Sequence, residues 1–373
     1  MQDVSLLPNQ GWEFPFQRPL LPPPERWMPY LAAIYAHRWF SNFGPVAQSL
    51  EQRLETRTGR PVQMAANGTA AITAALLALG RKGLVILPSF TFPATLMAVL
   101  EAGCTPALAD VDPVSWEMGP DQVAAVLPHL SCAPLAVLGV RPFGLCRDQV
   151  ALEHWCQERD VPLILDAAAA LGGALPDGRP VGGNGTMETF SLHATKVFAI
   201  GEGGAIAYMP QWQAPLREVL NFGMHSGNPV RTGINGKLSE FAAAIGLAQD
   251  DVFDEHLRVR RAAAERYRTF FMDYWPDWTP PWNPGSPPWQ AYPLLAPTPE
   301  ALQRTLQAVT AQGIQLRRYY HPALHQSPVG APYAPMPLPV SADLSTRMLC
   351  FPVYSDMSME DHFKIMNVLK SIT

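Results

Sequence analysis

The chain has 373 residues and a mass of 40.9 kDa, with 27 basic and 32 acidic side chains that give a net charge of −5. Because 48% of the residues are hydrophobic and only 16% are charged, the chain can bury a sizeable core, which excludes general disorder. No stretch concentrates lysine and arginine, which argues against a nucleic-acid-binding surface. No apolar run approaches the roughly 20 residues that span a bilayer, and the first ten residues hold no basic segment followed by an apolar one. We therefore expect a cytoplasmic protein.

Cysteine and lysine are both scarce. The five cysteines stand at positions 104, 132, 146, 156 and 350, an odd number without a CxxC pair. This pattern argues against a disulfide framework and a thiolate metal site, so we expect reduced, mostly buried thiols and no bound metal. Only five of the 27 basic residues are lysines, which shortens the search for an amine nucleophile.

Between about residue 61 and residue 208, short apolar runs alternate with stretches that have apolar positions at helical spacing. Seven runs are predicted as strands: 62–66, 84–87, 106–111, 135–140, 162–165, 189–192 and 205–208. The intervening helices are predicted at 70–79, 94–101, 120–127 and 148–159. This alternation indicates an α/β fold with a largely parallel sheet covered on both faces, whose ligands bind at the carboxyl ends of the strands.

A second, smaller domain is predicted beyond the sheet. An alanine-rich helical stretch at 239–274 and a Trp/Pro cluster at 275–289 are followed by a shorter α+β pattern. Its elements are a strand near 290–295, a helix at 299–312, a strand at 314–319 and a C-terminal helix from about 359. Proline, 39 residues in all, concentrates at 8–29, 276–299 and 322–339, which we predict to be loop or arm segments. We divide the chain into residues 1–250, a large domain with a Pro-rich N-terminal arm, and residues 251–373.

Asn67-Gly68-Thr69 stands between a predicted strand and a predicted helix. Glycine allows close backbone approach, threonine brings a hydroxyl, and a helix N-terminus offers free N–H groups, so the position suits a phosphate. The same three residues also make an ordinary turn and helix N-cap. The sequence has no GxGxxG and no GxxxxGK[ST], which disfavours a dinucleotide site or a P-loop.

Two charged residues follow predicted strands. Asp166 closes an apolar run, where its carboxylate needs a partner; the alternative is a helix N-cap for the alanine-rich segment after it. Lys196, flanked by Ser, His and Thr, precedes a glycine-rich stretch, whereas the other four lysines have surface-like settings. A desolvated lysine there would be a Schiff-base nucleophile, and an exposed loop lysine is the alternative.

Together these parts match the needs of pyridoxal phosphate. Its phosphate needs backbone donors, its ring nitrogen needs a carboxylate, and its aldehyde needs an amine. An aromatic side chain to stack on the ring is available in PSFTF at 88–92.

The sequence resembles the DegT/DnrJ/EryC1/StrS family of sugar aminotransferases, which has the aspartate-aminotransferase fold (fold type I of the pyridoxal-phosphate enzymes). The resemblance covers nearly the whole chain. Its motifs are FSNFGP at 40–45, NGTAA at 67–71, PSFTF at 88–92, DAAAALG at 166–172, SLHATK at 191–196, GEGGA at 201–205, NFG at 221–223, GINGKLSE at 233–240 and YHPALH at 320–325.

The resemblance implies a role for each matching position. Lys196 looks like the Schiff-base lysine that also shuttles the proton, and Asp166 looks like the partner of the pyridinium nitrogen. Phe92 would stack on the ring. The phosphate would be held by Gly68, Thr69 and Ser191, with Asn235 reaching it from the partner subunit of a homodimer. Tyr320 and His325 would face the substrate, although His325 could equally have a structural role.

Two positions depart from the family pattern. The family has Gln or His three residues after the aspartate, near the phenolic oxygen of the cofactor, where this chain has Ala169. The family's Arg in the Gly-x-Asn-x-Arg stretch is replaced by Lys237.

Within the family, the motif wording is most similar to enzymes that move the amino group of L-glutamate to C4 of a dTDP-4-keto-6-deoxyhexose and yield dTDP-4-amino-4,6-dideoxyglucose. The alternatives are amination at C3, another keto substrate such as a cyclitol, or a non-catalytic relative that serves as a binding or regulatory protein. The last is motivated only by Ala169.

Overall fold

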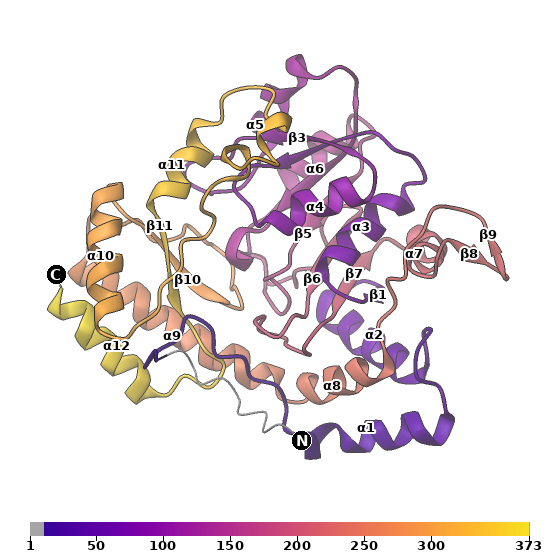
Figure 1. Cartoon of the computed structure of the whole chain (residues 1–373), viewed down its shortest axis with the longest axis horizontal. Coiled ribbons are helices and arrows are strands. Elements are labelled where there is room, and N and C mark those ends of the chain that lie inside the picture. The colour runs from indigo at the N-terminus through magenta and orange to yellow at the C-terminus, as the bar shows by residue number, and fades with distance from the viewer. Residues whose placement is uncertain (1–10, 373) are drawn as a thin grey trace.

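A buried seven-stranded sheet lies at the centre of the computed structural model, which describes residues 11–372 (Figure 1). Its strands are β1 (Val62–Ala65), β2 (Leu84–Pro88), β3 (Thr105–Ala109), β4 (Pro134–Val140), β5 (Leu163–Asp166), β6 (Met187–Ser191) and β7 (Gly204–Tyr208). They lie in the order β1-β7-β6-β5-β4-β2-β3, and of these seven β7 alone runs antiparallel to its neighbours. All seven predicted strands are therefore confirmed to within two residues.

Helices cover both faces of the sheet, which explains why the strands are continuous apolar runs. Alternate side chains of β2 enter different cores: Val85 and Leu87 pack on one face, and Leu84 and Ile86 on the other. The first face is covered by α3 (Gly68–Ala78), α4 (Pro93–Glu101) and α7 (Gln213–Leu220). The second is covered by α2 (Pro45–Thr58), α5 (Pro120–Val126), α6 (Val150–Gln157) and α8 (Glu240–Asp250). The four helices predicted between the strands are confirmed as α3 to α6.

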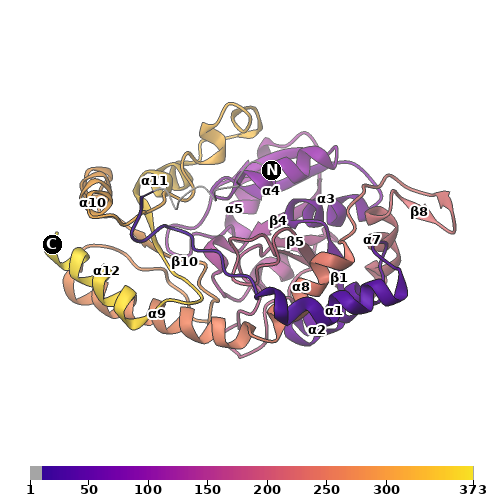
Figure 2. The same cartoon turned by 60° about the horizontal axis from the view of Figure 1, so that its bottom comes forward.

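The N-terminal segment corrects the prediction of a loop or arm over 8–29. Helix α1 (Pro24–His37) begins inside that range and lies along α8 (Figure 2). Pro24 at the first helical position forfeits no hydrogen bond, so it starts the helix at little cost. Pro29 lies inside α1, where proline is normally avoided, and this misled the prediction. Residues 1–10 of the arm lie outside the described residues.

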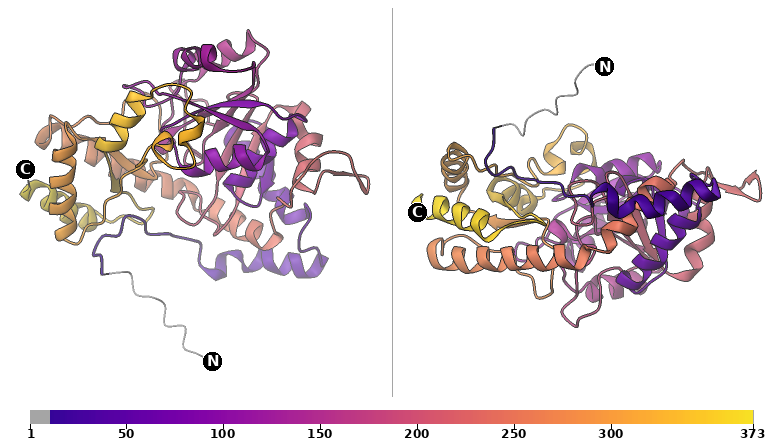
Figure 3. Two further views of the ribbon diagram at one scale, coloured as in Figure 1. Left: turned by 45° about the horizontal axis from the view of Figure 1, so that its top comes forward. Right: turned by 90° about the horizontal axis from the view of Figure 1, so that it is seen from below.

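The C-terminal part has its own aromatic core around Tyr267, Phe271 and Phe351. Its elements are α9 (Phe253–Tyr274), β10 (Ala291–Leu295), α10 (Pro299–Ala311), α11 (Pro339–Arg347), β11 (Met348–Pro352) and α12 (Met359–Ser371). The long helix α9 runs from the sheet to this part (Figure 3). A short hairpin of β8 (Met224–His225) and β9 (Asn228–Pro229) projects from the opposite end. The domain boundary at residue 250 stays a prediction.

One predicted strand in this part is wrong. The segment 314–319 forms isolated bridges at Ile314 and Arg317, and the true partner of β10 is β11. No glycine or proline separates β11 from α11, so the sequence gives no signal for the change from helix to strand. The predicted strand near 290–295 and the helices at 299–312 and from about 359 are confirmed as β10, α10 and α12.

The segment before α1 packs against the far end of the sequence. Phe14 exchanges backbone hydrogen bonds with Gly313 and Gln315, and the Phe16 N–H donates to Gln315 Oε1 at 2.9 Å. Both phenylalanines are buried. Arg18 then pairs with Asp356 and Asp361, each at 3.0 Å, so residues 14–18 are bound to the C-terminal core.

Two sequence-based expectations concern features outside the site. Four cysteines are buried and Cys132 is exposed, which confirms mostly buried thiols. Within residues 11–372, each helix is too short or too polar to cross a bilayer.

Candidate active site

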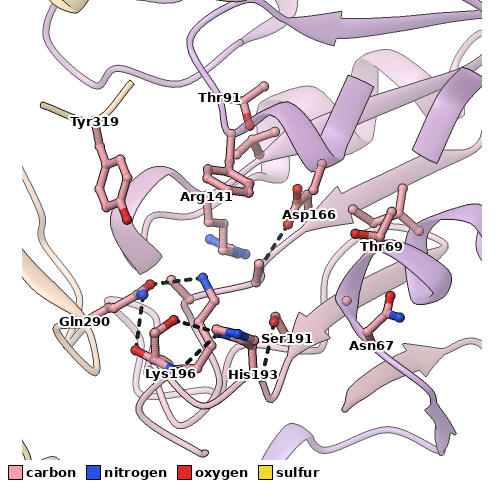
Figure 4. A pocket seen from close by; sticks show the side chains of 18 of the residues that line it. Asn67, Thr69, Thr91, Arg141, Asp166, Ser191, His193, Lys196, Gln290 and Tyr319 are labelled. Atoms are coloured by element: carbon pink, nitrogen blue, oxygen red, sulfur yellow. Dashed lines mark hydrogen bonds between the residues drawn. The ribbon is translucent and has the colours of Figure 1, made fainter. Parts of the chain in front are cut away.

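A cavity of about 920 Å³ opens at the carboxyl ends of β1, β4, β5 and β6. Its walls include most of the residues predicted from the sequence: Gly68, Thr69, Phe92, Asp166, Ala169, Ser191, Lys196 and Tyr320. Figure 4 shows Asn67 and Thr69 on one side of this pocket and Gln290 and Tyr319 on the other, with Lys196 reaching between them. The fold thus brings together residues that are far apart in the sequence.

The N-terminus of α3 faces the cavity and is pressed against β6. The Asn67 side chain caps the helix by accepting from the Ala70 N–H at 2.8 Å, so the predicted N-cap is present. A Cβ on Gly68 would lie 2.8 Å from the Ser191 Cβ, which leaves room for glycine only. The remaining N–H groups of the first turn have no intrahelical partner, so with the Thr69 and Ser191 hydroxyls they can bind a phosphate.

Asp166 ends β5 at the floor of the cavity and is 6% exposed. Its carboxylate accepts from the Thr95 hydroxyl at 2.7 Å and from the Ala168 N–H at 3.1 Å. Burial raises the pKa of Asp166, while these two hydrogen bonds and the charge of Lys196 act in the opposite direction. A cationic group in the cavity would stabilise the ionised form further.

Lys196 is a buried amine rather than an exposed loop lysine. Burial lowers its pKa to about 8, and the nearby charge of Asp166 partly opposes this shift. Nζ donates to Gln290 Oε1 at 3.1 Å. At neutral pH about a tenth of such amines are unprotonated, far more than for an ordinary lysine, which suits a nucleophile.

Aromatic residues and one arginine form the outer wall. Phe92 is 52% exposed, and its ring meets the edge of Tyr319 with centroids 6.4 Å apart. Tyr320 stacks on Phe143, and its hydroxyl accepts from the Phe143 N–H at 3.4 Å. Arg317 lines the cavity, is exposed, and pairs with no carboxylate in the described part of the chain.

Two predicted residues lie outside this cavity. His325 Nδ1 is 2.7 Å from the Ser89 hydroxyl, which also accepts from the His325 N–H, so its contacts are structural. Asn235 is exposed and accepts from Lys237 Nζ at 2.7 Å. Lys237 also lies over the Phe222 ring, 4.2 Å from its centroid.

Sequence reasoning missed two residues that line the cavity, Arg141 and Gln290, and one buried residue bound to Asp166, Thr95. Thr95 is bound to Asp166, Gln290 to Lys196, and Arg141 forms a fully buried pair with Glu188 at 2.6 Å. Thr95 had a local signal, since it lies on the first turn of the helix after PSFTF. Gln290 had none, because it lies 94 positions from Lys196.

These residues fit pyridoxal phosphate. The start of α3, where only glycine has room at position 68, offers free N–H groups to the cofactor's phosphate. The buried carboxylate of Asp166 can pair with the protonated ring nitrogen. The buried Lys196 amine fits the aldehyde. The cofactor supplies an electron sink that allows a proton to leave a carbon bearing nitrogen.

Comparison with known proteins agrees with this fit. Residues 25–370 match the model of the DegT/DnrJ/EryC1/StrS aminotransferase family. Protein Rv3402c of Mycobacterium tuberculosis is 32% identical over 94% of this chain and 87% of its own. The dTDP-4-amino-4,6-dideoxy-D-glucose transaminase of Shigella dysenteriae is 30% identical over 95% of this chain and 98% of its own. DesI, whose structure is known in the presence of its TDP-sugar product, is 32% identical to this chain in sequence. The two structures match with a TM-score of 0.86 over 95% of this chain and 91% of the DesI chain. The chain therefore belongs to the DegT/DnrJ/EryC1/StrS family and is a pyridoxal-phosphate-dependent sugar aminotransferase.

Proposed function

We propose that this enzyme transfers the amino group of L-glutamate to C4 of a nucleotide-linked 4-keto-6-deoxyhexose, with dTDP-4-keto-6-deoxyglucose as the substrate. The observation that carries the proposal is the placement in one cavity of the Lys196 amine and the Arg317 guanidinium, which forms no ion pair within residues 11–372. If the keto carbon of a nucleotide sugar lay at the Lys196 amine, the diphosphate of the same molecule could reach the Arg317 guanidinium. Relatives named for dTDP-4-amino-4,6-dideoxy-D-glucose align over almost their full length, which supports the C4 position.

Each residue has a defined part in this reaction. Lys196 would hold the cofactor through its amine, and the same amine, when free, would carry the proton. Asp166 holds a proton on the ring nitrogen, and Thr95 orients Asp166. The start of α3 and Ser191 hold the phosphate, and Phe92 covers the ring. Tyr320 is proposed to face the sugar. A cytoplasmic location stays a prediction.

A substrate panel tests the proposal. Purified protein and glutamate are mixed with 3-keto and 4-keto sugars linked to dTDP or UDP, and the new amine is located by NMR. We expect amination at C4 of the dTDP-4-keto sugar. Turnover only with a 3-keto sugar would favour the second candidate, which a Pseudomonas aeruginosa UDP-2-acetamido-2-deoxy-3-oxo-D-glucuronate aminotransferase supports at 29% identity over 60% of this chain.

Replacing Arg317 tests the anionic end of the substrate. Arg317→Gln should raise KM for the nucleotide sugar about tenfold, because a charge-assisted contact of about 1.5 kcal/mol is lost. KM for glutamate should change little. The difference between the two proteins should shrink at high salt, since exposed charges are screened. Arg304→Gln, on the exposed side of α10, is the control. An equal rise in both KM values would show a general effect on the site.

A mixing experiment tests whether the site is shared between two subunits of a homodimer. Asn235 is exposed and lies outside the cavity of its own chain, as expected if it completes the phosphate site of a partner. Asn235→Ala mixed with Lys196→Ala should regain partial activity, because one site of each heterodimer would then carry both native residues. Each parent should be much weaker than the mixture. No recovery after demonstrated subunit exchange would mean that the site is built within one chain.

A further inference from the structure

Within residues 11–372, Gln290 is the one hydrogen-bond partner of the Lys196 amine. Nζ donates to Gln290 Oε1 at 3.1 Å, and Gln290 Nε2 donates to the Thr195 carbonyl oxygen at 3.3 Å (Figure 4). The second bond fixes which end of the amide faces the amine, because the carbonyl oxygen of Thr195 can only accept. The Gln290 amide therefore links the Lys196 amine to the carbonyl oxygen of the preceding residue, Thr195, and so holds the end of the Lys196 side chain near the backbone.

The backbone that carries Gln290 is itself held by a buried cation. Arg260, on α9, donates to the carbonyl oxygens of Trp289 and Gln290 at 3.0 and 3.4 Å. The same guanidinium donates to the Ser355 hydroxyl and to the Val353 carbonyl oxygen, both at 2.8 Å. Arg260 is 5% exposed. Gln290 thus projects toward the sheet from a firmly bound point in the C-terminal part.

We propose that Gln290 is a positioning residue that holds the Lys196 amine in place and, because it is uncharged, lets the amine lose its proton near neutral pH. The proposal deepens the proposed function, since it rests on Lys196 acting as nucleophile and proton carrier. A Lys196 amine that is not bonded to the cofactor would have Gln290 Oε1 as its acceptor. From there it faces the cavity, where the proton has to be moved.

The effect of a charge at position 290 depends on the groups around the amine. From the sheet side, the titratable residues that line the cavity are Glu101, Arg141, Asp166, His193 and Glu202. From the C-terminal part they are Arg317, Tyr319 and Tyr320. Arg141 is paired with Glu188, and His193 with Glu202 at 3.6 Å, so the charge of Asp166 is the one that acts on Lys196. A carboxylate at position 290 would add a second, closer anion.

Two substitutions should move the pKa of Lys196 in opposite directions. Gln290→Glu places a negative charge about where Oε1 lies and should raise the pKa by about one to three units. Gln290→Met keeps the length of the side chain but removes the acceptor, and should lower the pKa, because the hydrogen bond favours the charged amine. The pKa is measured on the full chain without cofactor, by competitive acetylation of Lys196 at a series of pH values followed by mass spectrometry.

At pH 7 the acetylation rate of Lys196 should fall about tenfold or more in Gln290→Glu, and the difference should vanish at high pH. Gln213→Glu, the same change at an exposed residue at the start of α7, should leave the profile unaltered. Thermal unfolding confirms that each variant is folded. Identical profiles for wild type, Gln290→Glu and Gln290→Met would overturn the proposal. Because no sugar is present, this result is independent of the outcome of the substrate panel.

Discussion

Lys196→Ala should abolish transamination of glutamate, with a rate about 10⁴-fold or more below wild type. The variant loses both the group that attaches the cofactor and the base that moves the proton, and proton transfer alone contributes about 10²- to 10⁴-fold. Its side chain is half-buried and donates to Gln290, and Asp166, which loses the nearby charge, keeps its hydrogen bonds from Thr95 and Ala168. We therefore expect the protein to stay folded.

Borohydride reduction followed by mass spectrometry checks the same variant directly. Wild-type protein should carry the cofactor covalently at Lys196 after reduction, and Lys196→Ala should carry none. Lys82→Ala, a change at an exposed lysine, is the matched control and should behave like wild type. A normal rate of glutamate transamination by Lys196→Ala would show that another amine attaches the cofactor and moves the proton.

Asp166→Asn should lower kcat by about 10²- to 10³-fold, with little loss of stability. Asparagine is nearly isosteric and can still accept from Thr95, but it has no charge with which to hold a proton on the ring nitrogen. This range of rates corresponds to a loss of about 2.7–4.1 kcal/mol of transition-state stabilisation.

A cofactor methylated on the ring nitrogen separates this explanation from a structural one. The ring nitrogen of this analogue carries a permanent positive charge, so it stays charged without a neighbouring carboxylate. Reconstitution of Asp166→Asn with this analogue should restore part of the lost activity, whereas wild type should gain nothing. If the analogue gives no recovery although it binds, the role of Asp166 is to orient the ring rather than to charge it.

The central sheet and the chemical core of the site could be predicted because each depends on local sequence. Seven continuous apolar runs marked the strands, and Asp166 and Ser191 end two of them, so they had to meet at one edge. Lys196 was singled out because its four counterparts had surface-like settings. The assignment of Phe92, in contrast, came from the resemblance rather than from spacing.

The parts of the fold and of the site that could not be predicted depend on contacts between residues far apart in the sequence. Nothing in the sequence near Gln290 shows that Arg260 binds its backbone, and nothing near Arg141 shows that Glu188 neutralises it. Strand β11 was missed because it continues from α11 without a turn residue. Arg317 lies at the cavity because the C-terminal part folds back on the sheet, an arrangement that no local sequence signal indicates.

The contact between Phe14 and Phe16 and the C-terminal core has a consequence for synthesis on the ribosome. Gln315, whose side chain accepts from the Phe16 N–H, is synthesised 299 positions after Phe16. At about 5–20 residues per second, that separation corresponds to roughly 15–60 seconds. During this time the sheet can fold co-translationally, since β1 to β7 are complete by residue 208. Until residue 315 is synthesised, Phe14 and Phe16 lack the partners Gly313 and Gln315 that bind their backbone in the folded chain.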